Sequence, residues 1–157
     1  MSGHRLAGPR PPSQPAANAG IMDAMGYHVR VERTDDGFVA SNGRGAELRF
    51  GTGGDDASFT PVELLLVALG GCNIVTVEPL TAQRHHRLVR LAATVDAEKI
   101  KPNQLGPITM TYDVELPAGD ADAARVFHDV ALRVHEKACT VSTALETVSE
   151  VDLILPG

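Results

Sequence analysis

Two cysteines are the residues of this chain best suited to nucleophilic or redox chemistry. Cys72 lies within a long apolar segment, and Cys139 directly follows an amphipathic one. The sequence has two cysteines in total, and neither belongs to a C-x-x-C pair. Each one alone is also explained by the plainer role of a small buried hydrophobic residue. Spacing along the chain does not show whether the two sulfurs meet.

Histidines stand near the second cysteine. His135 precedes Cys139 by four residues, so in a continuous helix the two side chains share a face, and a protonated imidazole would favour the Cys139 thiolate. His128 shares the face of His135, and His85 is adjacent to His86. Because no C-x-x-C or H-E-x-x-H pattern accompanies them, we expect surface or core-edge histidines and no metal site.

The segment that must position Cys72 begins with a helix-start signal. Thr60 offers a side-chain oxygen to the first turn, Pro61 occupies a position that needs no N–H, and Glu63 completes a capping box. From Val62 to Val77 nearly every position is apolar or small, which predicts a helix buried on most sides. The segment is too short for a membrane span, and we expect no membrane association.

Two glycines precede the cysteine on this helix. Gly70 and Gly71 each weaken a helix by about 1 kcal/mol relative to alanine, so we expect another backbone to approach closely beside Cys72. Further along, Pro79 and the basic cluster 84–87 predict a kink or a second short helical piece.

Alternation of apolar and polar residues predicts strands on both sides of the central helix. Turns at 35–37 and 42–43 join the first three strands into an antiparallel meander. A later amphipathic helix is capped by Asp120 or Asp122 and runs to about Lys137, after which Ser142 caps a short turn through Glu146. The predicted strands are Tyr27–Arg33, Phe38–Ser41, Ala46–Phe50, Leu88–Glu98, Ile108–Leu116 and Val148–Leu155. The order is β-β-β-α-β-β-α-β, which predicts an α+β fold.

Composition limits the class of protein. A chain of 157 residues with 43% apolar residues is expected to form one domain, over residues 26–157, while the Pro-rich residues 1–25 are expected to be a disordered tail. A net charge of −6 with scattered basic residues argues against a nucleic-acid surface. Two cysteines and the lack of an apolar signal segment predict a cytoplasmic protein with reduced thiols.

The two cysteine segments together resemble those of a known family. The run T-P-x-E-L-L-L-x-A-L-G-G-C at 60–72 and the run A-C-x-V-S-x-A-L at 138–145 are similar to those of the OsmC/Ohr family, the osmotically inducible and organic hydroperoxide resistance proteins. The resemblance covers about Tyr27 to Leu155 in element order. It implies antiparallel sheets wrapped around a long central helix, in an intertwined homodimer, and it implies no cofactor.

The resemblance also implies a chemistry. Cys72 would be the peroxidatic residue that attacks an organic hydroperoxide, and Cys139 would resolve its sulfenic acid as a Cys72–Cys139 disulfide. An external dithiol would then reduce the disulfide. The protein would be a cofactor-free thiol peroxidase that acts in oxidative stress defence.

This chain departs from the peroxidase pattern in three places. Family peroxidases carry a glutamate directly after the helix-opening proline, whereas Val62 stands there and Glu63 follows one position later, a rotation of about 100°. Glu63 is therefore a candidate catalytic residue and equally a cap. Arg33 is the nearest candidate for the family arginine, with positions 30, 44 and 49 as alternatives, and Thr140 replaces the proline common after the second cysteine.

These departures are typical of a less characterised branch of the family, and they leave other functions open. One alternative is a non-catalytic OsmC-like dimer that binds a small apolar ligand or senses redox state. Another is a structural dimer with two inert buried cysteines.

Overall fold

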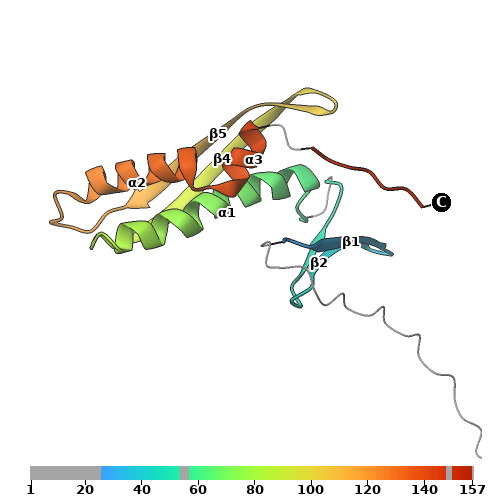
Figure 1. Cartoon of the computed structure of the whole chain (residues 1–157), viewed down its shortest axis with the longest axis horizontal. Coiled ribbons are helices and arrows are strands. Elements are labelled where there is room, and N and C mark those ends of the chain that lie inside the picture. Colours follow the sequence, from blue (N-terminus) through green and yellow to red (C-terminus); the bar gives the residue numbers. More distant parts are fainter. Residues whose placement is uncertain (1–25, 54–56, 148–149, 157) are drawn as a thin grey trace, which may run out of the picture.

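The computed structural model describes residues 26–53, 57–147 and 150–156, and it confirms the predicted α+β class with antiparallel sheets and one long helix (Figure 1). Its elements are β1 (Val29–Thr34), β2 (Gly37–Asn42), β3 (Glu47–Phe50), α1 (Pro61–Ala82), β4 (Arg90–Lys101), β5 (Gln104–Glu115), α2 (Ala123–Lys137) and α3 (Thr140–Glu146). The tail expected over residues 1–25 lies outside the described residues.

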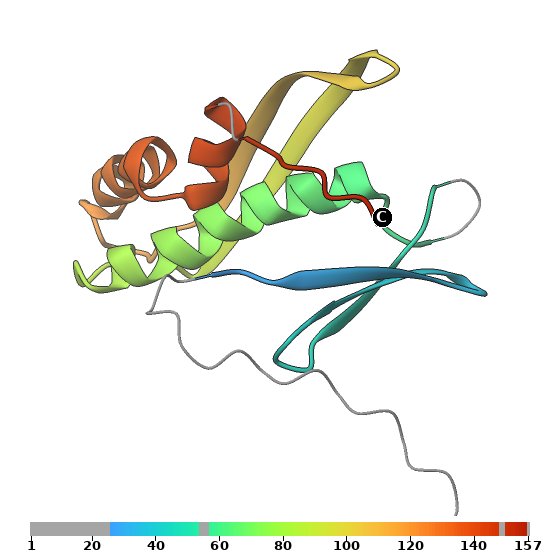
Figure 2. The same ribbon diagram turned by 45° about the vertical axis from the view of Figure 1, so that its right-hand side comes forward.

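Two separate antiparallel sheets lie on opposite sides of α1. The predicted meander is confirmed as the sheet β1-β2-β3, in which Phe38 and Phe50 stack with ring centroids 5.6 Å apart. The second sheet is the long β4–β5 hairpin. In both views α1 runs between this hairpin and the N-terminal sheet (Figures 1 and 2). The helix that carries Cys72 is therefore the central element of the chain.

The predicted capping box opens α1. The Glu63 amide donates to Thr60 Oγ1 at 3.2 Å, and Glu63 Oε2 accepts from the Thr60 amide at 2.7 Å. The separate helical piece considered after Pro79 is not formed, because α1 continues through Pro79 to Ala82. Pro79 removes one hydrogen bond, to the carbonyl of Val75. Both residues are exposed, so water can solvate that carbonyl.

The length of α1 also corrects the expectation that this segment is too short for a membrane span. At 22 residues it is long and apolar enough to cross a membrane, judged by length and composition alone. The central helix of a globular core meets the same measure.

One face of α1 is buried within the chain, and the expectation of burial on most sides is wrong. The buried positions are Leu69, Gly70, Asn73, Val77 and Thr81. On the other faces Val67 and Val75 are 51% and 69% exposed. Apolar side chains thus extend onto a face of α1 that this chain does not cover.

The close approach predicted at the two glycines occurs at one of them. A Cβ at Gly70 would lie 3.1 Å from Val95 Cγ2 on β4, whereas a Cβ at Gly71 would have no described neighbour within 4 Å. The approaching group is a side chain, and the prediction of a second backbone is wrong.

The core forms where α2 packs on the buried face of α1. Val126, Val130 and Val134 recur at helical spacing on α2 and meet Leu69 and Val77 of α1. Burying each such side chain contributes about 1.5–3 kcal/mol. The ring of Phe127 packs edge-on against Tyr112 of β5, with centroids 5.4 Å apart. The N-terminus of α2 is stabilised by Asp120, whose Oδ1 accepts from the Asp122 and Ala123 amides.

Two predictions beyond the central helix are wrong in part. The stretch around Gly106 and Pro107, expected to be a connection, belongs to β5, and a register shift leaves Pro107 without a ladder partner. The last strand, expected over Val148–Leu155, is not a strand in the described residues 150–156, which are exposed; residues 148 and 149 lie outside the described part. A strand needs a neighbouring edge, and residues 150–156 pair with none that is described.

Candidate functional site

The two sulfurs lie together where α1 meets α3. Cys72 comes from the middle of α1 and is part-buried, whereas Cys139 is fully buried at the start of α3. Cys72 packs against the core cluster that contains Cys139, each thiol shifts the pKa of the other, and both are free thiols. The fold therefore brings together two residues that are distant in sequence.

Cys139 is itself the N-cap of α3. Its backbone is extended, at φ −85° and ψ 107°, and its Sγ accepts from the Ser142 amide at 3.3 Å. The prediction that Ser142 caps this turn is wrong, because Ser142 is the third residue of the helix. A sulfur atom thus takes the place of the oxygen that usually caps a helix.

A buried asparagine connects the two sides of the site. Asn73 follows Cys72 on α1 and is 0% exposed. Its Nδ2 donates to Leu69 O at 3.0 Å, to Cys139 Sγ at 3.4 Å and to Ser142 Oγ at 3.4 Å. Its Oδ1 accepts from the Tyr112 hydroxyl of β5, also at 3.4 Å. One amide therefore links α1, α3 and β5 around the sulfur pair.

The two thiols differ in acidity. Burial, followed by the hydrogen bond to Cys139, raises the pKa of Cys72 above its ordinary value, against the opposing amides of Val141 and Thr140. Burial also opposes charge on Cys139, but hydrogen bonds from Cys72, from the side chain and amide of Ser142 and from the Val141 amide outweigh it, so the pKa of Cys139 is lowered. The negative charge of the pair is therefore favoured on Cys139.

The other predicted site residues lie elsewhere. Glu63 is hydrogen bonded to the Thr60 amide and hydroxyl, which lower its pKa. Arg33 is exposed on β1, opposite Phe38. Neither is among the principal groups that set the pKa of Cys72. Within the described chain, the structure brings Cys72 and Cys139 together and leaves Glu63 and Arg33 out of their contact.

His135 does not act on Cys139 as the helical spacing suggested. Helix α2 ends at Lys137, before the cysteine, and His135 Nε2 lies 3.5 Å from Glu146 Oε1 instead. Across the described residues, no group of three or more histidine, cysteine, aspartate and glutamate side chains is placed to hold a metal ion.

Comparison with known proteins decides the family. The family model described as OsmC-like protein matches residues 53–154, well over half of the chain. The chain belongs to the OsmC-like family. An uncharacterized protein of Mycobacterium tuberculosis is 28% identical to it over 128 residues, which cover 78% of this chain and 91% of the relative.

Solved structures show the same fold for this OsmC-like chain. An OsmC-like protein from Mycoplasma pneumoniae superposes with a TM-score of 0.63 at 16% identity, covering 80% of this chain and 91% of that one. A putative osmotic stress induced and detoxification response protein from Psychrobacter arcticus gives a TM-score of 0.60 at 15% identity, covering 79% and 91%.

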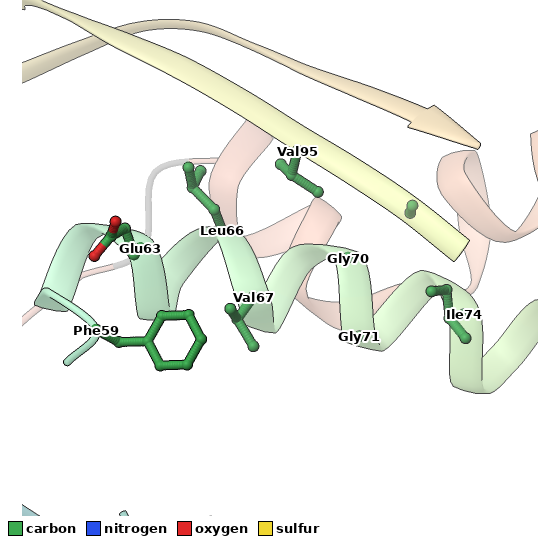
Figure 3. Close-up of a pocket in the computed structure, with 9 residues that line it drawn as sticks. Phe59, Glu63, Leu66, Val67, Gly70, Gly71, Ile74 and Val95 are labelled. Atoms are coloured by element: carbon green, nitrogen blue, oxygen red, sulfur yellow. The ribbon is translucent and has the colours of Figure 1, made fainter. Parts of the chain in front are cut away.

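A groove of about 400 Å³ runs along α1 of this OsmC-like chain, beside β4 (Figure 3). Val95 points from β4 toward the helix, while Gly70 and Gly71 leave the helix surface bare. The groove is mostly apolar, and Glu63 lies at the end of α1 where the helix begins. Its lining comprises Phe59, Glu63, Leu66, Val67, Gly70, Gly71, Ile74, Ala93 and Val95. It therefore reaches the residue directly before Cys72.

Three residues of the site were not predicted from the sequence. Asn73 gave a usable signal, because it is a polar residue in an apolar helix and buried amides need partners. Ser142 belongs to the second cysteine motif of the OsmC-like family but was assigned only a capping role. Tyr112 gave no signal, since its ring continues the apolar face of its strand and nothing in the alternation indicates where its hydroxyl points.

Proposed function

We propose that this OsmC-like protein is a thiol-dependent peroxidase that reduces organic hydroperoxides in oxidative stress defence. The observation that carries the proposal is the neighbouring pair of free thiols, Cys72 and Cys139, at the junction of α1 and α3. A reacting thiol with a second thiol in contact can form a disulfide before it is over-oxidised.

The difference in burial supports the two proposed roles. Cys72 is part-buried and Cys139 is 0% exposed, so Cys72 is the sulfur that a substrate can reach. Cys72 attacks the O–O bond as a thiolate and becomes a sulfenic acid while the alcohol leaves. Cys139 then attacks that sulfur, water is released, and a Cys72–Cys139 disulfide remains. An external dithiol restores both thiols, and no cofactor takes part.

The groove favours an organic substrate over hydrogen peroxide. Its lining is apolar along most of α1 and ends at Gly71, directly before the reacting residue. Apolar pockets with few polar groups suit small apolar ligands. We therefore propose that the alkyl or aryl part of the hydroperoxide lies along this groove.

We also propose that the protein acts as a homodimer in the reducing cytoplasm. The supporting feature is the face of α1 that its own chain leaves open, where Val67 and Val75 are 51% and 69% exposed. Apolar surface of this kind is commonly covered by a partner. A second copy of the chain supplies a surface of the same apolar character.

The test is hydroperoxide consumption with a dithiol reductant. The full chain should consume cumene hydroperoxide, and Cys72→Ser should abolish this. Cys139→Ser should still be oxidised once at Cys72 but form no intramolecular disulfide, as measured by mass analysis under non-reducing conditions. A Cys72→Ser protein that keeps the parent rate would disprove the proposal.

A second function is favoured by the acidity of the pair. Since the pKa of Cys72 is raised and no arginine is among the groups that principally set it, a slow redox sensor or a binder of small apolar ligands is the alternative. Such a protein would be oxidised stoichiometrically and would show no sustained turnover with dithiol. Sustained turnover would exclude this alternative as the main role.

A further inference from the structure

Hydrogen-bond donors converge on Cys139. Asn73 Nδ2 lies 3.4 Å from its Sγ, and the Ser142 amide lies 3.3 Å from the same atom. A neutral thiol is only a weak acceptor, whereas hydrogen bonds to a charged acceptor are considerably stronger. Two donors from different helices on one fully buried sulfur therefore favour its thiolate form.

The orientation of Asn73 is fixed by its other partners. Oδ1 accepts from the Tyr112 hydroxyl, and one N–H of Nδ2 donates to the Leu69 carbonyl at 3.0 Å. Turning the amide around would place its oxygen against the Leu69 carbonyl, two acceptors with no donor between them. The remaining N–H is thus held toward Cys139 and Ser142 Oγ.

We propose that Asn73 and Ser142 are positioning residues that place the resting thiolate of the pair on Cys139, so that Cys139 is the proton acceptor for Cys72. The mechanistic part of this assignment rests on the proposed hydroperoxide reduction. The pKa directions agree with it, since the pKa of Cys139 is lowered and that of Cys72 is raised.

The proton and electrons balance along this route. Cys72 first passes its proton to the Cys139 thiolate. The Cys72 thiolate then forms an S–O bond as the O–O bond breaks, and the departing alkoxide takes the proton from Cys139 to become the alcohol. The regenerated Cys139 thiolate attacks the sulfenic acid, an S–S bond forms, and hydroxide leaves. Two thiol sulfurs are oxidised and the peroxide is reduced by two electrons.

Other titratable groups near Cys139 come from three elements. Tyr112 faces it from β5, and burial followed by the nearby Cys139 raises the pKa of Tyr112 to about 12, so this hydroxyl remains a neutral donor. On α2 and α3, His135 and Glu146 pair with each other at 3.5 Å. A His135→Gln variant separates any contribution of that pair from the titration of the thiols.

The experiment is a pH titration of the reduced full chain, labelled with ¹³C at the cysteine Cβ atoms and followed by NMR. Cys72→Ser and Cys139→Ser assign the two signals. We expect the lower midpoint to belong to Cys139. Asn73→Leu should reduce the acid dissociation constant of Cys139 by about tenfold, and Ser142→Ala should change it in the same direction. Thr81→Val, which alters a buried hydroxyl two turns along α1, should leave both midpoints unchanged.

Two results would overturn the assignment: a lower midpoint at Cys72, or an unchanged Cys139 midpoint in folded Asn73→Leu protein. If Asn73→Leu does not fold, an unchanged Cys139 midpoint in folded Asn73→Ala protein overturns it equally, because that variant also removes the Nδ2 donor. The titration uses no peroxide, so the two proposals fail separately. Cys139 ionising first without hydroperoxide turnover would refute the proposed function alone, and turnover with Cys72 ionising first would refute the thiolate assignment alone.

Discussion

Replacing Gly70 tests how the helix that carries Cys72 is held against β4. A Cβ at Gly70 would lie 3.1 Å from Val95 Cγ2, inside the separation of about 3.5–4.0 Å that favours carbon contacts. Overpacking of this kind costs about 1–3 kcal/mol, whereas alanine is about 1 kcal/mol better than glycine in a helix. Gly70→Ala should therefore lower the free energy of unfolding by about 0–2 kcal/mol, equivalent to about 2–4 °C per kcal/mol in a domain of this size.

A double-mutant cycle separates the steric contact between residue 70 and Val95 from the gain in helix propensity that alanine brings at position 70. Val95→Ala removes the methyl group that Gly70→Ala would meet, so the double variant should recover about 1–2 kcal/mol relative to the sum of the single changes. Urea unfolding of the reduced protein at one fixed concentration, followed by far-ultraviolet circular dichroism, measures all four proteins. Additivity within about 0.5 kcal/mol would refute the reasoning, because the approach of Val95 would then not limit the residue at this position.

Four further variants test other parts of the structure. A Cβ at Gly71 would have no described atom of its own chain within 4 Å beyond the backbone of its own helix. In the proposed homodimer, Gly71→Ala should therefore weaken self-association by about fivefold or more, as measured by sedimentation. Unchanged association together with about 1 kcal/mol of added stability would contradict that interface. Thr60→Ala removes the N-cap of α1 and should lower the free energy of unfolding by about 1 kcal/mol. Glu63→Gln should leave the rate of hydroperoxide consumption within about twofold of the parent rate, and a rate lower by about tenfold or more would instead assign Glu63 to the reaction. The hydrogen bond from His86 lowers the pKa of Asp120, so its stabilising effect is present above the unfolded value of about 3.9 and is lost as pH falls through the lower folded value. Asp120→Asn should thus flatten the acid limb of the urea midpoint between about pH 5 and about pH 2, and an identical pH dependence in both proteins would disprove the link.

Capping and turn signals in the sequence predicted the elements well wherever the hydrogen bonds that define an element join residues close in sequence. The capping box at Thr60 and the turns of the N-terminal meander are confirmed because their hydrogen bonds connect residues close in sequence. The end of α1 was missed because Pro79 is tolerated on an exposed face. The strand expected near the C-terminus was missed in the described residues because a strand depends on a distant partner.

The two cysteines of the candidate site could be predicted from the sequence, whereas most of the residues that surround them could not. The family resemblance placed Cys72 and Cys139 in one reaction, and the structure brings them together. The groups around the two sulfurs come from α1, α3 and β5, which are distant in sequence. The polarity of Asn73 was therefore the only sign of its role, and nothing in the sequence indicated the direction of the Tyr112 hydroxyl. Glu63 illustrates the opposite case, because its carboxylate is held by the local hydrogen bond to the Thr60 amide and is not directed toward the cysteines.

The part-buried Tyr112 of this network also gives the protein a built-in optical reporter. The sequence contains two tyrosines and no tryptophan, so these two rings are its main near-ultraviolet chromophores. Tyr27 is 86% exposed, whereas Tyr112 touches the asparagine that holds Cys139. Near-ultraviolet circular dichroism should therefore follow oxidation of the sulfur pair directly, with no label attached, through the asymmetry that the site imposes on a single ring.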